Sequence, residues 1–242
     1  GNPIRQLASV MNTTSKAIDL PVRAGSHAAQ NAGATKDVAD NGNASVGVTT
    51  LIVQTFNART DVTIEAVNDI PGFDQFWAQD MLAEVASIEA GEHVTELATL
   101  TAGKVAAAVG TVTWDEIVDY SIEPASRVGG AFMFSSEIMN QLRTLSNSGT
   151  GSELLFDPEL GGFRLFGAPV YENGYMAAPT ANAVTGAFGD WKRGLVIAQR
   201  AAASVGRYDQ TVPGMYAYYA EMRSGISNWD NSALKTLKMA AA

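Results

Sequence analysis

The sequence predicts an α+β fold in which one long helix lies beside a sheet of long strands. Apolar residues recur at steps of three and four over 73–97, which is the pattern of a helix with one apolar face. Residues 216–223 alternate as a strand does. Two further runs rich in β-branched residues, 18–22 and 46–56, flank a Gly, Ala, Asn and Asp stretch over 25–45, which predicts a long hairpin.

The composition indicates a well-packed protein with a charge-poor surface, part of which we expect neighbouring molecules to cover. The 242 residues are 46% hydrophobic and 17% charged, with a net charge of −9 and no cysteine. The acidic balance argues against a broad basic face that grips nucleic acid. The lack of cysteine excludes disulfides and thiolate sites. No apolar run reaches the roughly 18 residues of a membrane span and no signal peptide begins the chain, so we expect no membrane partner.

Residues 1–18 are expected to form an arm that packs on another element. Ile4 and Leu7 are apolar, but the segment is too poor in such residues to bury a core of its own. The tip of the following hairpin is about twenty residues long, and loops of that length in compact domains tend to be functional. We expect the tip to reach outward to a partner, so deleting 25–45 should leave the core folded and abolish assembly.

The predicted long helix is expected to run along the molecule as a spine and not to be buried inside a core. Residues 59–67 alternate as a strand before it. At 1.5 Å per residue, a helix over 73–97 spans about 37 Å, which is long for a chain of this size.

Helix caps and buried runs mark the middle of the chain. Thr113 and Glu116 have the spacing of a capping box, which predicts the start of a helix. A short buried strand is expected over 131–134. A serine-started helix should follow and end over 147–151.

Short strands and turns are expected in the last third of the chain. The predicted strands are 163–165, 168–171, 195–199, 204–208 and 216–223, with a short closing segment over 233–239. A small-residue loop is expected over 177–187, and a Gly-Asp turn at Gly189 and Asp190.

No motif predicts a catalytic, metal or cofactor site. His27 and His93 are the only histidines, and the sequence supplies neither with the partners of a catalytic triad or a metal cluster. The acidic run over 37–43 lacks the spaced oxygens of a calcium loop. Residues 149–152 lack the lysine of a phosphate-binding loop. We therefore predict no catalytic residues and no cofactor.

Four short motifs follow one another in a definite order. They are Leu142 and Leu145 at a helix end, Gly167 to Val170 in a strand, Gly189 to Trp191 in a turn, and Glu221 to Arg223 in a closing strand. In this order, and with the predicted arm, hairpin and spine helix, the chain resembles the major capsid proteins of tailed bacteriophages of the Hong Kong 97 type. The similarity covers nearly the whole chain.

The resemblance implies a Hong Kong 97-type capsid fold with four parts. These are an N-terminal arm (1–18), an extended β-hairpin loop (19–56), a peripheral domain with the spine helix and long sheet (57–109 and 186–225), and an axial domain (110–185 and 226–242). One departure from the family pattern is that many relatives have a Gly-rich segment after the spine helix, where this chain is rich in Ala and Thr over 96–110.

The resemblance also implies a non-enzymatic function in the virion. Copies of the chain would form hexamers and pentamers of an icosahedral shell around double-stranded DNA, which they contact non-specifically, and would assemble in the cytoplasm of the host bacterium. The other partners that it implies are a portal protein, a scaffold or a protease that removes an N-terminal segment, and decoration proteins.

Eight residues are expected at subunit interfaces: Ile4, Leu7, Lys36, Arg59, Asp61, Arg200, Arg207 and Arg223. Ile4 and Leu7 belong to the arm, and the arginines and Asp61 are expected to form pairs between subunits. Lys36 lies in the loop region where one family member forms a Lys–Asn isopeptide bond. No matching acid and Asn can be assigned here, so we do not predict that cross-link.

Two other functions remain open from the sequence. An encapsulin-type nanocompartment shares the fold but encloses cargo enzymes, and the contents of native particles distinguish it from a phage shell. A small-molecule enzyme or binding protein with an irregular α+β fold would instead be a monomer or small oligomer with a pocket.

Overall fold

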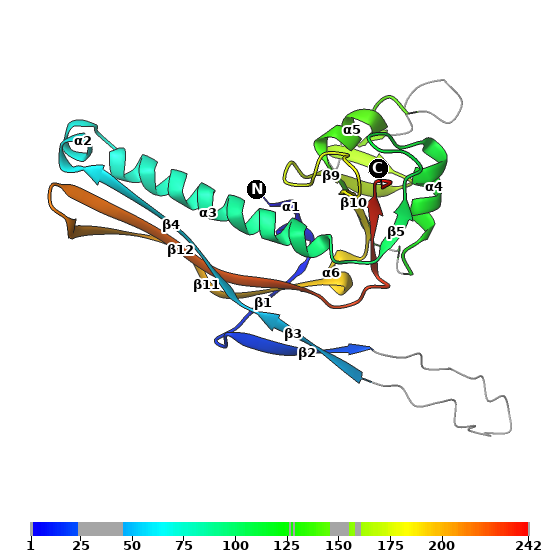
Figure 1. The fold of residues 1–242 in the computed structure, drawn as a ribbon, viewed down its shortest axis with the longest axis horizontal. Helices are drawn as coiled ribbons and strands as arrows, with labels where there is room; N and C mark the ends of the chain where they lie inside the picture. Colours follow the sequence, from blue (N-terminus) through cyan, green and yellow to red (C-terminus); the bar gives the residue numbers. More distant parts are fainter. Residues whose placement is uncertain are drawn as a thin grey trace.

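The structure consists of a compact body and a long limb that extends from it (Figure 1). This computed structural model describes residues 2–23, 46–125, 127, 129–145, 155–157 and 161–241. The limb contains the long helix and the long strands, and the body contains the shorter elements and the C-terminal end of the chain.

The limb is built from the first part of the chain and two long C-terminal strands. Its elements are α1 (Pro3–Leu7), β1 (Ser9–Asn12), β2 (Ala17–Arg23), β3 (Val46–Ile52), β4 (Gln54–Thr63), α2 (Ile64–Asp69), α3 (Phe73–Leu97), β11 (Leu195–Val212) and β12 (Met215–Asn228). The main sheet has the strand order β1-β11-β12-β4, in which β1 is parallel to β11 and the other neighbours are antiparallel. Strands β2 and β3 form a separate antiparallel pair.

Helix α3 confirms the predicted spine helix, with the same bounds. Met81 and Val85 lie one turn apart on its buried face and pack with Phe56 of β4 and with Tyr218 and Met222 of β12. The limb is therefore a two-layer structure of one helix on one sheet.

The body surrounds a seven-stranded sheet. Its elements are β5 (Ala102–Val105), α4 (Trp114–Ile122), β6 (Ala131–Phe134), α5 (Ser136–Leu142), β7 (Leu155–Asp157), β8 (Gly162–Leu165), β9 (Ala168–Glu172), β10 (Val184–Gly189), α6 (Trp191–Gly194) and β13 (Leu234–Lys238). The strand order is β5-β13-β10-β6-β9-β8-β7. Helix α6 lies between β10 of the body and β11 of the limb, so it marks the junction of the two parts.

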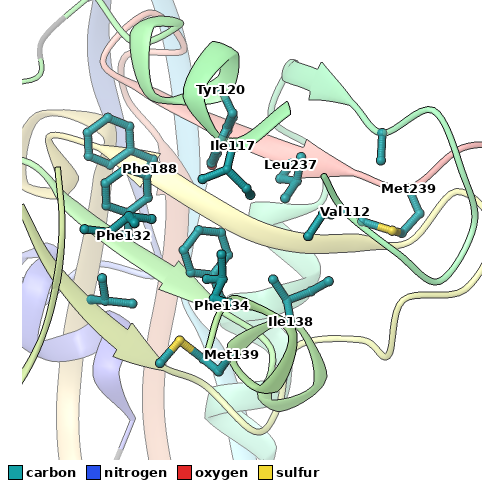
Figure 2. Close-up of a cluster of buried hydrophobic side chains, with 14 residues drawn as sticks. Val112, Ile117, Tyr120, Phe132, Phe134, Ile138, Met139, Phe188, Leu237 and Met239 are labelled. Atoms are coloured by element: carbon teal, nitrogen blue, oxygen red, sulfur yellow. The ribbon is translucent and has the colours of Figure 1, made fainter. Parts of the chain in front are cut away.

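Aromatic side chains fill the core of the body, which Figure 2 shows. Phe132 stacks on Phe188 with 3.7 Å between ring centroids and on Phe134 with 5.6 Å. The three rings are buried, and burial of each contributes roughly 1.5 to 3 kcal/mol. Tyr120 meets the same cluster from α4 and donates from its hydroxyl to the backbone oxygen of Lys235 at 2.8 Å. Burial raises the pKa of this hydroxyl well above its usual value.

The expected helix starts and the expected buried strand in the middle of the chain are confirmed. Thr113 and Glu116 form the predicted capping box at the start of α4, and Glu116 accepts from the backbone N–H of Thr113 at 2.7 Å. Residues 131–134 form the fully buried β6, and Ser135 caps α5. The predicted helix end over 147–151 is wrong, because α5 already ends at Leu142 and a turn follows at 143–144.

The loop expected over 177–187 is wrong in its last part, where β10 lies between β6 and β13. Close packing explains the small residues there, because a Cβ on Gly186 would lie 2.7 Å from the ring of Phe134. Residues 186–189, which the expected domain boundaries grouped with the long sheet, therefore belong to the sheet of the body.

The continuous run expected over 46–56 is divided at Val53. The backbone N–H of Val53 donates to the carbonyl oxygen of Lys16 at 2.8 Å, and its side chain is buried under the hairpin. The chain passes from the β2–β3 pair to the main sheet at this residue, so β3 and β4 pair with different strands.

Two other expected boundaries are also wrong. Residues 64–67 belong to helix α2 and not to a strand, because the Thr63 hydroxyl accepts from the backbone N–H of Ala66 and caps a helix. The strands expected over 195–199 and 204–208 are parts of one strand, β11. Register shifts between them absorb the extra residues, as β-bulges do.

Candidate assembly surfaces

The main sheet of the limb has one face under α3 and an opposite face, which we call the outer face. Side chains alternate along β12, so Tyr218 points to α3 and Tyr219 points to the outer face. In the register of the sheet, Arg59 of β4 pairs with Tyr219 of β12, and Tyr208 of β11 pairs with Ala217 of β12. These four outer-face residues line a shallow hollow of about 200 Å³. Tyr208 is 54% exposed, so the hollow is accessible to a partner.

Three of the charged residues predicted at interfaces lie together on the outer face. The guanidinium of Arg59 lies 3.2 Å from the carboxylate of Asp61, and that of Arg223 lies 4.0 Å from Glu221. Exposed pairs of this kind usually contribute less than about 1 kcal/mol to folding. Their pairing with a neighbouring subunit stays a prediction.

Arg207, a fourth predicted residue, lies on the helix side of the sheet. Its guanidinium lies 3.1 Å from Asp74 in the first turn of α3, 3.2 Å from Asp209, and 4.6 Å from the ring centroid of Tyr216. The Tyr218 hydroxyl donates to Asp74, and this hydrogen bond, followed by the charge of Arg207, lowers the pKa of Asp74. Burial and the bond to Asp74 raise the pKa of Tyr218 to about 12. Arg207 therefore ties β11 to the start of the spine helix.

The other predicted interface residues fall in three places. Arg200 is exposed at the first register shift of β11 and forms no ion pair with any described residue. Lys36 lies outside the described residues. Ile4 is fully buried in a cluster that includes Leu97, and Leu7 packs against the same cluster. The arm therefore packs on its own chain, so the expectation of Ile4 as an interface side chain does not hold in this structure.

The hairpin of β2 and β3 covers the part of the outer face nearest the body. Leu51 is buried against Val196 of β11. Gly225 of β12 permits the close crossing, because a Cβ there would lie 2.3 Å from the carbonyl oxygen of Ile52. Past the crossing the hairpin projects from the sheet (Figure 1), and Val48 is 66% exposed.

A pocket of about 630 Å³ lies where this hairpin meets the end of β12. It is lined by Pro21, Val22, Arg193, Trp229, Asp230, Asn231 and Ser232. The Trp229 indole donates to the carbonyl oxygen of Pro21 at 2.9 Å, and Arg193 donates to Asp230 at 2.8 Å. The first bond connects β2 to the residue that follows β12. The second connects α6 to the turn after β12.

The described residues contain no group of three or more His, Cys, Asp or Glu placed to bind a metal ion. His93 is buried beside Asn2 and Glu89, and His27 lies outside the described residues. None of the helices in the described ranges combines the length and hydrophobicity that a membrane span requires.

Two tyrosines of the outer face, Tyr208, which is exposed, and Tyr219, which is half-buried, are not among the residues predicted at interfaces. The signal was present in the alternation over 216–223. Tyr216 and Tyr218 pack under α3, so the same alternation places Tyr219 on the opposite face.

Comparisons with known proteins agree with this architecture. The profile described as the phage capsid family matches residues 1–239. The capsid of an empty GTA particle is 22% identical, with a TM-score of 0.83 over 99% of this chain and 90% of that chain. The structure of Mycobacterium phage Bobi is 16% identical, with a TM-score of 0.68 over 100% and 91%. A comparison with curated protein sequences finds no match.

The structural similarities, at these low identities, establish a shared fold, and the profile establishes the family. The profile matches residues 1–239, which include the arm, the limb and the body, and the similar structure aligns with 99% of this chain. The chain belongs to the phage capsid family: it is a major capsid protein, a structural protein whose copies build an icosahedral shell.

Proposed function

We propose that copies of this chain form hexamers and pentamers that tile the shell of a tailed phage around double-stranded DNA. The observation that carries the proposal is the limb, whose outer face presents Tyr208, Tyr219 and Arg59 around an open hollow. Tyrosine and arginine are the residues most enriched at the energetic centres of protein interfaces. A limb open on one face therefore suits a subunit that a neighbour completes.

The mechanism that we propose is geometric. Each outer face receives a neighbouring copy, and such head-to-tail contacts close into rings when the rotation between copies permits it. Arg59, Asp61, Arg200 and Arg223 would pair across these contacts. Many modest contacts then act together, and the closed shell is far more stable than any single interface.

The proposed domains follow the two parts of the molecule. The hairpin loop (19–56) and the spine helix with the long sheet would contact neighbouring copies, whereas the described part of the arm (1–18) packs on its own chain. The axial domain, 110–185 with 226–242, would meet its copies around the capsomer axis. The seven-stranded sheet supports extending the axial domain to residue 189.

The proposed partners follow from the family and from the charge of the chain. A net charge of −9 suits a container that touches packed DNA only non-specifically. We propose assembly in the host cytoplasm with a portal protein and a scaffold or protease, binding of decoration proteins outside, and no enzymatic activity.

Negative-stain electron microscopy with light scattering tests assembly directly. We expect closed particles, or free hexamers and pentamers, from the purified chain. A monodisperse species near 25.5 kDa under all assembly conditions would contradict the proposal. Double-stranded DNA inside native particles would support a phage shell over an encapsulin-type compartment, which would hold protein cargo instead.

Paired variants test the outer face itself. Tyr219→Ser combined with Tyr208→Ser should leave the fold intact and reduce particle yield at least tenfold. Tyr175→Ser is the matched control, since this tyrosine of the body is 47% exposed and should leave the yield unchanged. Equal yields from both variants would remove the outer face from the assembly mechanism.

A further inference from the structure

Polar side chains form a buried cluster where the arm, the spine helix and the long sheet meet. The Asn2 side-chain amide donates to Nδ1 of His93 at 2.8 Å. The Arg5 guanidinium lies 2.6 Å from Oε1 of Glu89, and the Ser224 hydroxyl donates to the same oxygen at 2.7 Å. His93 is 1% exposed and Glu89 is 3% exposed. Buried polar groups are costly without hydrogen bonds, so the positions of the protons in this cluster matter.

The hydrogen bonds assign the protonation state of His93. Asn2 caps α1, and its Oδ1 accepts from the backbone N–H of Ile4 at 3.1 Å. The amide NH₂ therefore faces His93, and an NH₂ group can only donate. Nδ1 must accept this bond, so it carries no proton, and the imidazole is neutral with its proton on Nε2.

The surroundings oppose a positive charge on His93. The charged and titratable groups around it are Arg5 from α1 and Glu89, Glu92 and Glu96 from α3, whereas β4, β11 and β12 contribute the neutral Gln54, Gln199 and Ser224. Burial lowers the pKa of His93, Glu89 and Glu92 raise it, Arg5 lowers it, and the net shift is downward. Glu89 is 3.6 Å from Nε2, but Arg5 already neutralises it.

Protonation of His93 therefore destabilises the closed arm. A proton on Nδ1 would point at the NH₂ group of Asn2, which places two donors against each other. The amide cannot turn to offer its oxygen, because that oxygen caps α1. The new charge would also lie in a buried space where the carboxylate of Glu89 is already paired.

We propose that Asn2 and His93 form an acid-opened clasp, in which protonation of His93 releases Asn2 and opens the first turn of the arm, residues 2–7. The parallel pairing of β1 with β11 holds the arm beyond that turn, so the opening is local. The folded-state pKa lies below the usual value of 6.5, so the clasp is closed above pH 6.5. Below it, opening rises by up to about tenfold per pH unit until the lower pKa is reached.

Hydrogen exchange of the full-length protein, followed by mass spectrometry, measures this opening. Between pH 7.5 and 5.5, after correction for intrinsic exchange rates, amides of residues 4–7 should lose protection by up to about tenfold, and those of α3 should not. His93→Gln keeps a neutral acceptor at every pH and should show constant protection, while His27→Gln should behave as the wild type. Unchanged wild-type protection, or an equal loss in His93→Gln, would overturn the clasp.

A substitution at Asn2 keeps the test decisive if His93→Gln folds poorly. Aspartate caps helices as well as asparagine does, and its carboxylate accepts from a protonated Nδ1. Asn2→Asp should therefore hold the arm closed at pH 5.5 as firmly as at pH 7.5. Acid opening that persists in Asn2→Asp would show that His93 is not the group that controls the arm.

Discussion

The body and the limb bury their apolar side chains in different ways. In the body, every side chain of β6 is buried, and strands pair with both of its edges. In the limb, α3 covers one face of the sheet, and Tyr219, Glu221 and Arg223 on the outer face of β12 are only partly buried. The body is therefore complete as a folded unit. The limb is complete only on the side of its helix.

This difference assigns different sources of stability to the two parts. Beyond the arm and the hairpin crossing, the limb is buried against one helix face only, so this part should open locally at a lower free energy than the body. Contacts that a neighbour makes with the outer face exist only in the folded limb, and by linkage they stabilise it. We therefore expect assembly to protect the limb more than the body.

The largest loss of stability is expected from a cavity-forming substitution in the core of the body. Phe132→Ala removes a fully buried ring that stacks on Phe188, and such substitutions cost about 3 to 5 kcal/mol. Urea unfolding of the unassembled chain measures the loss. Phe76→Ala removes a ring that is 63% exposed and should cost less than about 1 kcal/mol. Equal losses would show that the stacked core does not dominate the stability of the body.

A cavity-forming substitution in the limb should cause a smaller and more local loss of stability. Met81→Ala removes a side chain buried between α3 and the long sheet, with an expected cost of about 2 to 3 kcal/mol. Hydrogen exchange should show lost protection in α3, β4 and β12 and unchanged protection in β6 and β10. The loss should shrink in assembled particles. Equal loss of protection in the body would mean that the two parts unfold together.

The same comparison explains which elements the sequence predicts. The α3 helix and the Thr113 capping box are local patterns, so both are found from sequence with their correct positions. The sequence predicts a loop where β10 begins, because Gly186 is small for a non-local reason, the ring of Phe134 on the neighbouring strand. Whether a segment of the body forms a strand depends on contacts with residues that are distant in sequence. The β-propensity of the segment itself does not report those contacts.

The candidate surfaces divide in a similar way. Alternation along β12 places Tyr219 and Arg223 on one face, so this part of the outer face is readable from sequence. Ile4 was expected at an interface because nothing near it in sequence could bury it, yet its cover comes from Leu97 and other distant residues. The contact of Asn2 with His93 joins residues 91 positions apart and has no local signal.

A Cβ at the hairpin crossing should disturb only the hairpin. Gly225→Ala forces β3 away from β12, because the new methyl group would lie 2.3 Å from the carbonyl oxygen of Ile52. We expect a loss of about 1 to 2 kcal/mol, typical of overpacking, and faster exchange in β2 and β3. Gly206→Ala is the matched control on the outer face, where the nearest contact is the flexible Tyr208 ring at 3.3 Å. Similar exchange in both variants would show that the crossing is not tightly packed.

The smallest effect is expected at the far end of the limb, where Asp74 is exposed. The hydrogen bond from Tyr218 and the charge of Arg207 lower the pKa of Asp74 below 3.8 in the folded chain. The stabilisation is therefore fully present above pH 3.8 and is lost as the pH falls through the folded-state pKa.

Asp74→Asn should lower the urea midpoint slightly at pH 6, and the difference from the wild type should vanish toward pH 2.5. Asp80→Asn, at an exposed position of the same helix, removes the same charge and is the matched control, and its urea midpoint at pH 6 should equal that of the wild type. A difference that persists at pH 2.5 would mean that Asp74 acts through packing at the end of the spine helix and not through its charge.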